Sequence, residues 1–452
     1  MGNQPDPLES MRSRAERVLV GGVSRGFNLL PDVGPIYFDS ATGSEITDIR
    51  GDRYLDYVMG WGSLILGHDP PSIRSALLAT LRGGFLAQYE TELHVRLAEI
   101  LCGCVPCAER VRFAASGLEA TQYAIRLARA ATGRERIIKC EGHFHGMNDQ
   151  LLFSSGAPIG TRDRDGLIEP VPTSAGIPGV LRDLLVVVPY NDADAIVAAV
   201  RRHRGQVAAI ILEPIALNNG CILPESGYLE AVRALADHEG IILIFDEILT
   251  GFRVALGGAQ ELLSVTPDLA CFSKAFGCGL PIAALAGRLD IMQHLGPPGD
   301  VPMSGTHAGR ILSVAGTLAG LDVLMQPGFY DHLKSLNHHF VVGLRDLFVQ
   351  YGVPGFVQGI GGRIGAYFGL TSPPREVRDV ATGWNSQYHR AFFHRLVTEQ
   401  KVYGFVPLPF GPDALNLSTA HTDYVLDETL RRMGIVLAEL PYREAPAQPN
   451  RP

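Results

Sequence analysis

Lys274 and Asp246 are the residues whose type and setting most directly suggest chemistry. Each follows a run of apolar residues, Leu269–Phe272 before the lysine and Ile241–Phe245 before the aspartate. Desolvation lowers the pKa of a lysine and makes its amine nucleophilic toward a carbonyl. A buried carboxylate needs a cationic partner, such as a protonated ring nitrogen. The alternatives are a lysine whose amine reaches solvent and an aspartate that caps a helix or forms a buried ion pair.

Two further stretches offer contacts for a flat, phosphorylated molecule. Ser116 and Gly117 precede the predicted helix Glu119–Ala131, and backbone N–H groups at a helix N-terminus bind anions, although Ser-Gly at this place is also a common helix cap. His143–Gly146 follows the predicted strand Ile137–Cys140, and an aromatic ring at a strand end can stack on a heterocycle. The alternative for its two histidines is a metal site, but no matching carboxylate motif accompanies them.

Together, these four stretches supply a phosphate anchor, a carboxylate for a ring nitrogen, an amine for an aldehyde and a stacking surface. Pyridoxal 5'-phosphate (PLP) requires these groups, so we predict PLP as the cofactor. A metal site is not predicted. Cys102, Cys104 and Cys107 are clustered, but no second pair of cysteines or histidines supplies the remaining ligands.

The elements that must position these residues follow an α/β pattern. Between about residues 110 and 290, apolar runs without polar alternation are separated by helical patterns, which indicates a mostly parallel sheet covered on both faces. Ligands of such sheets bind beyond the carboxyl ends of the strands. The predicted strands are Val111–Ala114, Ile137–Cys140, Leu184–Val188, Val207–Leu212, Ile241–Phe245, Leu269–Phe272 and Ile282–Ala286, and the predicted helices are Glu119–Ala131, Asp192–Arg202 and Tyr228–His238.

The two ends of the chain predict a smaller α+β unit. Near the N-terminus, strands are expected at Ile36–Phe38, Glu45–Asp48 and Tyr54–Val58, with a turn at Gly51-Asp52. Residues of about 330–440 mix helices with short strands and include a Gly-rich turn at Gly359–Gly365. The predicted organisation is an N-terminal segment 1–60 that joins the small domain, a large α/β domain 61–325 and a C-terminal small α+β domain 326–452.

Composition and charge narrow the class of protein. Of the 452 residues, 46% are apolar and 19% are charged, and 39 Lys and Arg against 47 Asp and Glu give a net charge of −8, which is typical of a globular protein and not of a nucleic-acid binder. The sequence contains neither an apolar stretch long enough to span a membrane nor the apolar run of a secretion signal. Seven cysteines, an odd number, fit a reducing compartment. We therefore expect a cytoplasmic protein without membrane or nucleic-acid partners.

Motifs from about residue 16 to 429 resemble those of the class III (fold type I) PLP-dependent aminotransferases, in particular the glutamate-1-semialdehyde 2,1-aminomutase branch. The most specific is Leu243-Ile-Phe-Asp-Glu-Ile-Leu-Thr-Gly-Phe-Arg253. The others, in order, are Trp61-Gly62, Ile65–His68, Ser116–Thr121, Ala124–Arg129, His145-Gly146, Pro189–Asp192, Glu213-Pro214, Ala255–Gln260, Lys274, Gly279–Pro281, Gly305-Thr306 and Ser418–Thr422. The resemblance implies a large domain with a mostly parallel seven-stranded sheet and a smaller α+β domain.

The resemblance also assigns roles to the reactive residues. Lys274 matches the lysine that forms the Schiff base with PLP and moves protons during transfer. Asp246 matches the acid on the pyridine nitrogen. Ile248 and Phe144 match the residues on the two ring faces, and His145 belongs to the same cofactor-binding turn. Asn218 matches a position near the phenolic oxygen of the cofactor.

Phosphate binding is implied for Ser116, Gly117 and Leu118, and for Thr306, which matches a residue that reaches the phosphate across a subunit interface. A homodimer with composite sites follows from that match. The sequence departs from the family pattern at three of these places. Phe144 replaces Tyr, Leu118 replaces Thr, and Arg310-Ile311 replaces the usual Asn-Pro.

The turn Gly21–Asn28 bears on the reaction type. Aminomutases of the family follow Gly-Gly-Val with Asn-Ser-Pro-Val-Arg, whereas this chain has Arg25 at the serine position and Asn28 at the arginine position. Because the guanidinium fork demands a defined geometry, a displaced arginine favours another substrate anion. Arg25 is therefore a candidate substrate ligand, although a surface arginine is an equal alternative. Trp61 and Arg363 are further candidates.

The predicted function is therefore amino transfer between an amine donor and a carbonyl acceptor through Lys274. Intramolecular transfer by a glutamate-1-semialdehyde 2,1-aminomutase is the alternative. An NAD(P)-dependent oxidoreductase would need a Gly-x-Gly-x-x-Gly loop after its first strand, and the loop after Val111–Ala114 has one glycine. A non-catalytic member of the family is the remaining alternative, and the retained Lys274 and Asp246 argue against it.

Overall fold

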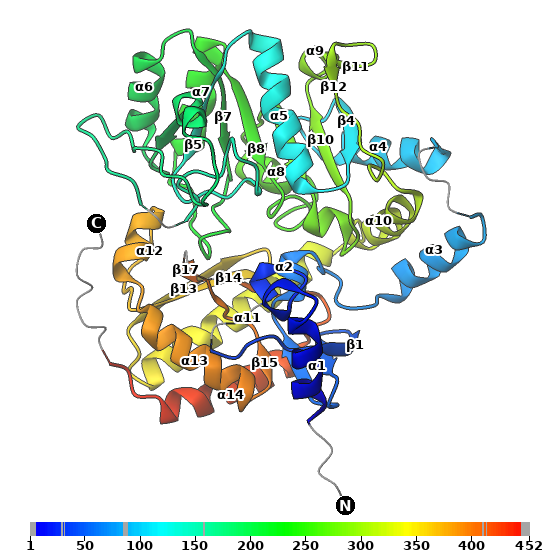
Figure 1. The fold of residues 1–452 in the computed structure, drawn as a ribbon, viewed down its shortest axis with the longest axis vertical. Helices are drawn as coiled ribbons and strands as arrows, with labels where there is room; N and C mark the ends of the chain where they lie inside the picture. The colour runs from blue at the N-terminus through cyan, green and yellow to red at the C-terminus, as the bar shows by residue number, and fades with distance from the viewer. Residues whose placement is uncertain are drawn as a thin grey trace, which may run out of the picture.

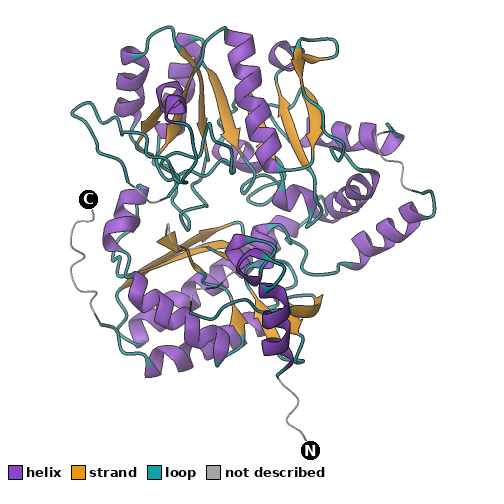
Figure 2. Cartoon of the chain, in the orientation of Figure 1, coloured by secondary structure: helices purple, strands orange, loops and turns teal. Residues whose placement is uncertain are grey.

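The computed structural model describes residues 6–28, 30, 32–84, 89–156, 159–408, 411–412 and 414–443. Figure 1 shows a large sheet with helices in one half of the molecule, and a second half in which α11, α13 and α14 pack beside smaller sheets. Figure 2 shows that strands of the large sheet are covered by helices, while the loops at one edge of that sheet face the second half. Asp246 and Lys274 are found at this edge of the large sheet.

The large sheet has seven strands in the order β4-β10-β9-β8-β7-β5-β6. β10 is antiparallel to both of its neighbours, and all other pairs are parallel, so the predicted mostly parallel seven-stranded sheet is confirmed. The strand bounds are β4 Arg110–Ala114, β5 Arg136–Cys140, β6 Leu185–Val188, β7 Val207–Leu212, β8 Ile242–Asp246, β9 Leu269–Phe272 and β10 Ala283–Gly287.

The central strands lack polar alternation because both faces of the sheet are covered. In β7, Ile211 packs with the apolar face of α5 (Gly117–Thr132). The next residue back, Ile210, packs on the opposite face with α6 (Ala193–Arg202) and α7 (Tyr228–Glu239). Every residue of β7 is buried, as expected for a strand between two layers of helices.

The N-terminal hairpin forms a four-stranded sheet in the order β1-β2-β3-β15. β2 (Glu45–Asp48) and β3 (Arg53–Asp56) lie close to the predicted strands, and β15 (Val402–Tyr403) pairs parallel to β3. The predicted strand Ile36–Phe38 was misplaced, because β1 spans Phe38–Thr42. Its last four residues are exposed, so this edge strand carries no apolar alternation that would reveal it.

The predicted Gly-rich turn at Gly359–Gly365 is in fact a tight hairpin between β13 (Gly355–Ile360) and β14 (Arg363–Phe368). Only Gly361 and Gly362 form the turn, with φ of 58° and 72°, as a two-residue hairpin turn requires. Gly365 lies within β14, where a Cβ would come within 2.9 Å of Tyr367 Oη. Close packing, and not turn geometry, explains why residue 365 is a glycine.

The remaining elements complete the two halves. The other helices are α1 Pro7–Glu16, α2 Met59–Gly62, α3 Pro71–Leu81, α4 Glu92–Cys104, α8 Gly258–Leu263, α9 Leu289–Met292, α10 Ile311–Leu324, α11 Phe329–Gln350, α12 Val377–Gly383, α13 Ser386–Thr398 and α14 Asp423–Glu439. The short strands are β11 Leu295–Gly296, β12 Val301–Pro302, β16 Pro407–Leu408, β17 Gly411–Pro412 and β18 Leu415–Asn416. Among the described helices, none alone is long and apolar enough to cross a membrane, and only α10 and α11 taken together, across a 77° bend, meet that test.

Candidate active site

Asp246 and Lys274 lie at the same edge of the large sheet because their strands are parallel neighbours. Asp246 is the last residue of β8 and pairs in register with Cys271 of β9. Lys274 follows β9 by two residues and begins the short helix η4 (Lys274–Gly277). The carboxyl ends of these two strands therefore bring an acid and a lysine to the same edge of the sheet, where ligands of such sheets bind.

Asp246 is buried and has two fixed hydrogen-bond partners. Its Oδ2 lies 2.7 Å from His145 Nδ1, and its Oδ1 accepts a hydrogen bond from the Ile248 N–H at 3.1 Å. The carboxylate is 3% exposed. A carboxylate offers about four acceptor positions, so the two contacts leave room for another donor, such as a protonated ring nitrogen.

Lys274 is half-buried and has an unusual backbone conformation. Its φ of 47° lies in the left-handed region, which costs a non-glycine residue about 1–3 kcal/mol. The preceding Ser273 holds the turn, because its hydroxyl donates to the Ile282 carbonyl at 2.9 Å. Strain of this kind persists where the surrounding structure fixes a side chain in a particular place.

The start of α5 provides backbone N–H groups beside Asp246. Ser116 is the N-cap of α5, and its hydroxyl accepts a hydrogen bond from the Glu119 N–H at 3.3 Å. The side chain therefore caps the helix, which was the alternative to anion binding. Gly117 and Leu118 are the first helical residues, and their N–H groups have no acceptor within the helix. A Cβ on Gly117 would come within 2.6 Å of Ile248 Cδ1, which places Ile248 directly against the turn predicted to bind phosphate.

The turn His143–Gly146 joins the same site. The Thr121 hydroxyl of α5 donates to the His145 carbonyl at 2.8 Å, and a Cβ on Gly146 would come within 2.9 Å of Leu118 Cδ1. Phe144 is half-buried between these contacts. His145 Nε2 is buried without a hydrogen-bond partner in the described part of the chain. The α5 start, this turn and the end of β8 therefore form one continuous surface.

Glu213 joins two turns of the candidate site, although its sequence pattern alone predicted no role for it. One carboxylate oxygen accepts from the Phe144 N–H at 3.0 Å, and the other accepts from Leu217 N–H at 3.0 Å and Asn218 N–H at 3.2 Å. It thus joins the Phe144 turn to the turn that carries Asn218. Burial and the nearby Asp246 raise the pKa of Glu213. The signal was available, because Glu213 directly follows the buried strand β7, much as Asp246 ends β8.

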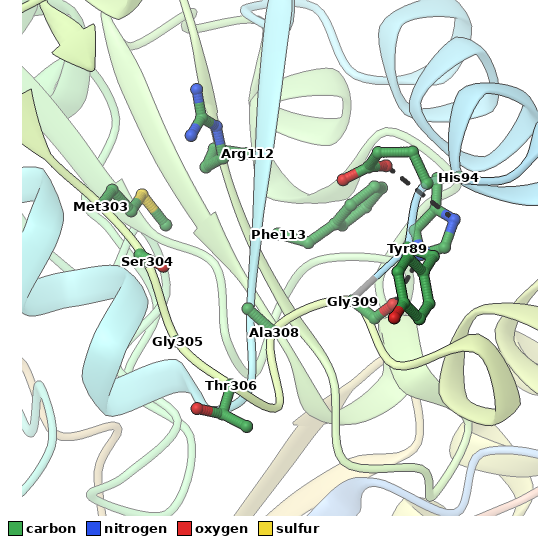
Figure 3. Close-up of a pocket in the computed structure, with 11 residues that line it drawn as sticks. Tyr89, His94, Arg112, Phe113, Met303, Ser304, Gly305, Thr306, Ala308 and Gly309 are labelled. Carbon is green, nitrogen blue, oxygen red and sulfur yellow. Dashed lines mark hydrogen bonds and ion pairs between the residues drawn. The ribbon is translucent and has the colours of Figure 1, made fainter. Parts of the chain in front are cut away.

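Thr306 lies on a loop beside the start of α5, because a Cβ on the neighbouring Gly305 would come within 3.8 Å of Glu119 Oε2. Thr306 is exposed on the loop 304–307 and lines a cavity of about 390 Å³ whose lining includes none of the other residues predicted to bind the cofactor. Figure 3 shows this cavity, with Thr306 on one side and Tyr89 and His94 on the other. His94 Nε2 lies 2.6 Å from the Gly309 carbonyl, which holds one end of the loop.

The three candidate substrate residues occupy two places. Arg25 is exposed, and with Trp61 it lines a cavity of about 460 Å³ that also includes Phe38 and Tyr403. Arg363 is buried, and its Nε donates to the Leu217 carbonyl at 2.9 Å.

Trp61 connects these two places. It belongs to a left-handed turn, Met59–Gly62, with φ between 45° and 85°. A Cβ on Gly62 would come within 3.3 Å of Arg363 Nη1, so Arg363 lies directly beside this turn.

The residues at the edge of the sheet fit PLP chemically. Asp246 has acceptor capacity for a ring nitrogen, Ile248 and Phe144 are half-buried apolar side chains, and the first N–H groups of α5 suit a phosphate. A methyl group on Gly117 would displace Ile248, so the glycine keeps this surface open. For metal ions, no group of three or more His, Cys, Asp or Glu side chains suited to binding one is found within the described ranges.

Comparison with known proteins places the chain in a family. A model of aminotransferase class III matches residues 31–428. The chain is 39% identical over 421 residues to a glutamate-1-semialdehyde 2,1-aminomutase from Persephonella marina, covering 92% of this chain and 95% of that protein. This chain belongs to the class III aminotransferase family, so it is an enzyme of amino transfer, as predicted.

Solved structures agree with this assignment. An omega-transaminase from Sphaerobacter thermophilus superposes with a TM-score of 0.88 at 30% identity, covering 96% of this chain and 98% of that one. The FumI protein of a Sphingopyxis species, solved in a PLP internal aldimine form, superposes with a TM-score of 0.82 at 26% identity, covering 96% of each chain. The predicted fold type I architecture is therefore confirmed.

Proposed function

We propose that this enzyme binds PLP at the carboxyl edge of the large sheet and transfers an amino group from an amine donor to a separate carbonyl acceptor. The observation that carries the proposal is the pairing of β8 with β9, which sets a buried acid and a half-buried lysine beside an anion-binding helix start. PLP, when bound, supplies an electron-withdrawing ring that stabilises negative charge on the substrate carbon.

Each residue of this site has a role that follows from its position. Lys274 would hold the cofactor through its aldehyde, and its amine would move a proton at the substrate carbon. Asp246 would keep the ring nitrogen of the cofactor protonated, and its contact with His145 at 2.7 Å fixes the orientation of the carboxylate. Ile248 and Phe144 exclude water from the two ring faces. The N–H groups of Gly117 and Leu118 hold the phosphate.

A second copy of the chain would complete the site. Thr306 is exposed on its loop, and the nearby surface carries large apolar side chains in contact with solvent: Tyr89 is 68% exposed and Val95 57% exposed. Exposed apolar side chains that form a contiguous patch mark interfaces. A homodimer in which Thr306 reaches the partner's phosphate site accounts for both features. All seven cysteines are unpaired, in keeping with the expected reducing compartment.

Intramolecular transfer is the second candidate, because the Persephonella marina relative is named an aminomutase. The position of Arg25 favours transfer between two molecules. Arg25 lines a cavity shared with aromatic side chains and with the carboxylates of Asp39 and Asp56, and the aromatic side chains suit a substrate with an apolar body. The candidate donor is therefore an amine or amino acid that leaves as its carbonyl product.

A single half-reaction distinguishes these functions. Purified PLP-loaded enzyme mixed with an amine donor alone should lose its visible absorption band and release one carbonyl product per site, and the band should return when a carbonyl acceptor is added. Efficient conversion of glutamate-1-semialdehyde, without any external donor or acceptor, would identify an aminomutase instead. An enzyme that takes up no PLP would contradict both candidates.

A further inference from the structure

Lys139 is a buried lysine that has no part in the proposed reaction. It is a residue of β5, and its side chain is fully buried. Its Nζ lies among four oxygens: the carbonyls of His143, Leu151 and Phe153 at 2.9, 3.0 and 2.7 Å, and the Ser155 hydroxyl at 2.9 Å. We call these four atoms the oxygen cage.

The oxygen cage is suited to a small cation. All four of its atoms are neutral oxygens that can accept hydrogen bonds, whereas buried lysines usually pair with carboxylates. Burial lowers the pKa of the Lys139 amine to about 7, but the cage favours the charged form, because an ammonium has three N–H donors and no lone pair facing the oxygens. The charged amine thus takes the place that a bound monovalent cation would occupy.

The oxygen cage is built from the loop that carries the cofactor-facing turn. Residues 143–155 follow β5 along the chain. They include the turn with Phe144 and His145, and they supply all four oxygens around Nζ. One cage oxygen belongs to His143, which directly precedes Phe144 and His145. The other end of this turn is held by Asp246 and Glu213. Lys139 is therefore the cation around which the loop closes.

We propose that Lys139 is a positioning residue, a covalently tethered cation that orders the 143–155 loop and thereby holds Phe144 and His145 against the cofactor. This inference rests on the proposed function for the identity of the cofactor. The order of the loop itself is independent of PLP and can be measured on the cofactor-free protein.

Two measurements on the variant Lys139→Met test the proposal. This substitution keeps an apolar stem and removes the ammonium, and Lys334→Met, at an exposed position of α11, is the matched control. We expect faster amide hydrogen exchange in residues 143–155 without PLP, and a dissociation constant for PLP raised about tenfold, because charge-assisted hydrogen bonds are lost. The control should change neither quantity.

Rescue by a free cation separates positioning from simple core packing. In Lys139→Ala, the vacated space should accept K⁺, so K⁺ should restore both exchange protection and PLP affinity, whereas tetramethylammonium at equal ionic strength should restore neither. Normal exchange and PLP affinity in Lys139→Met would overturn the proposal, and so would a loss of global stability that leaves PLP affinity unchanged and does not respond to K⁺.

A milder variant covers the case in which both Lys139 variants fail to fold. Ser155→Ala removes one cage oxygen and should raise exchange in the loop and weaken PLP binding, and an unchanged protein would overturn the proposal. If the wild-type chain takes up no PLP, the proposed function fails, while the exchange measurement still tests the cage.

Discussion

Asp246, Glu213 and Lys139 show how single buried polar residues set the geometry of this active site. Each lies at or near the carboxyl end of a buried strand, and each is held by partners on other elements. Asp246 and Lys274 were predictable because they end apolar runs. Glu213 met the same criterion, but its importance depends on which N–H groups surround it, and a sequence does not show these. Lys139 was not found because it lies within a strand.

The carboxylate of Asp246 should be essential for turnover but not for cofactor uptake. Asp246→Asn keeps the shape of the side chain and removes the negative charge that keeps the ring nitrogen protonated. We expect turnover to fall about 100-fold or more while PLP remains bound. Absorbance of the bound cofactor and steady-state rates measure the two effects. Asp149→Asn, at an exposed position, is the control, and an active Asp246→Asn enzyme would contradict the assigned role.

At the level of elements, regular buried segments were predicted well and polar edges were not. The helix predicted from residue 119 begins at Gly117, and β7 and β9 have the predicted bounds, because strands covered on both faces leave unbroken apolar runs. β1 was misplaced because it faces solvent. The contacts of α5 with Ile248 and His145 depend on how distant loops pack, so the neighbours of the phosphate-binding turn could not be predicted from periodicity.

Any side chain at Gly117, the first residue of α5, should weaken cofactor binding. In Gly117→Ala, the new methyl group would lie 2.6 Å from Ile248 Cδ1, so Ile248 must rotate away from the ring position. We expect PLP binding about tenfold weaker, with little change in overall stability. Gly103→Ala in α4, where a Cβ meets nothing within 4 Å, should bind PLP normally. Unchanged affinity in Gly117→Ala would show that Ile248 does not contact the ring.

On the scale of the whole molecule, contacts between the two halves hold the chain where it leaves the large sheet. Arg378 of α12 forms a bidentate pair with Glu141 directly after β5, at 2.7 and 3.0 Å. The Glu141 side chain is 1% exposed. Two histidines, His389 and His421, are fully buried in the second half. Neither the Arg378–Glu141 pair nor the burial of the two histidines could be predicted from the sequence, because each depends on residues that only the folded chain brings together.

Removing Arg378 should destabilise the folded protein. Arg378→Ala leaves the Glu141 carboxylate buried without its cation, which typically costs about 3 kcal/mol. The free energy of unfolding in urea measures the loss, and Arg164→Ala, at a side chain 94% exposed, is the control. Adding Glu141→Gln to the variant should restore part of the stability. A variant as stable as the wild type would show that the pair contributes nothing.

Stability should fall as the pH is lowered from about 6.5 to 4. Burial lowers the pKa of His389 and of His421 to about 4. Within this pH window the unfolded chain binds more protons than the folded one, so the unfolding free energy decreases with falling pH, by up to roughly 3 kcal/mol per histidine. His389→Gln should make the decrease shallower in urea titrations at several pH values. His238→Gln, at an exposed position, should leave the decrease in unfolding free energy unchanged. Equal decreases in the wild type, His389→Gln and His238→Gln would refute this linkage.

The bond between Lys274 and the cofactor can be tested with the absorption spectrum of the reconstituted enzyme. Wild-type enzyme reconstituted with PLP should show a visible absorption band that borohydride reduction fixes covalently to the peptide containing residue 274. Lys274→Ala should lack the covalent label and turnover, while still binding PLP through the Asp246 and α5 contacts. A labelled peptide elsewhere in the chain, or a Lys274→Ala enzyme that keeps its turnover and its covalent label, would contradict the account.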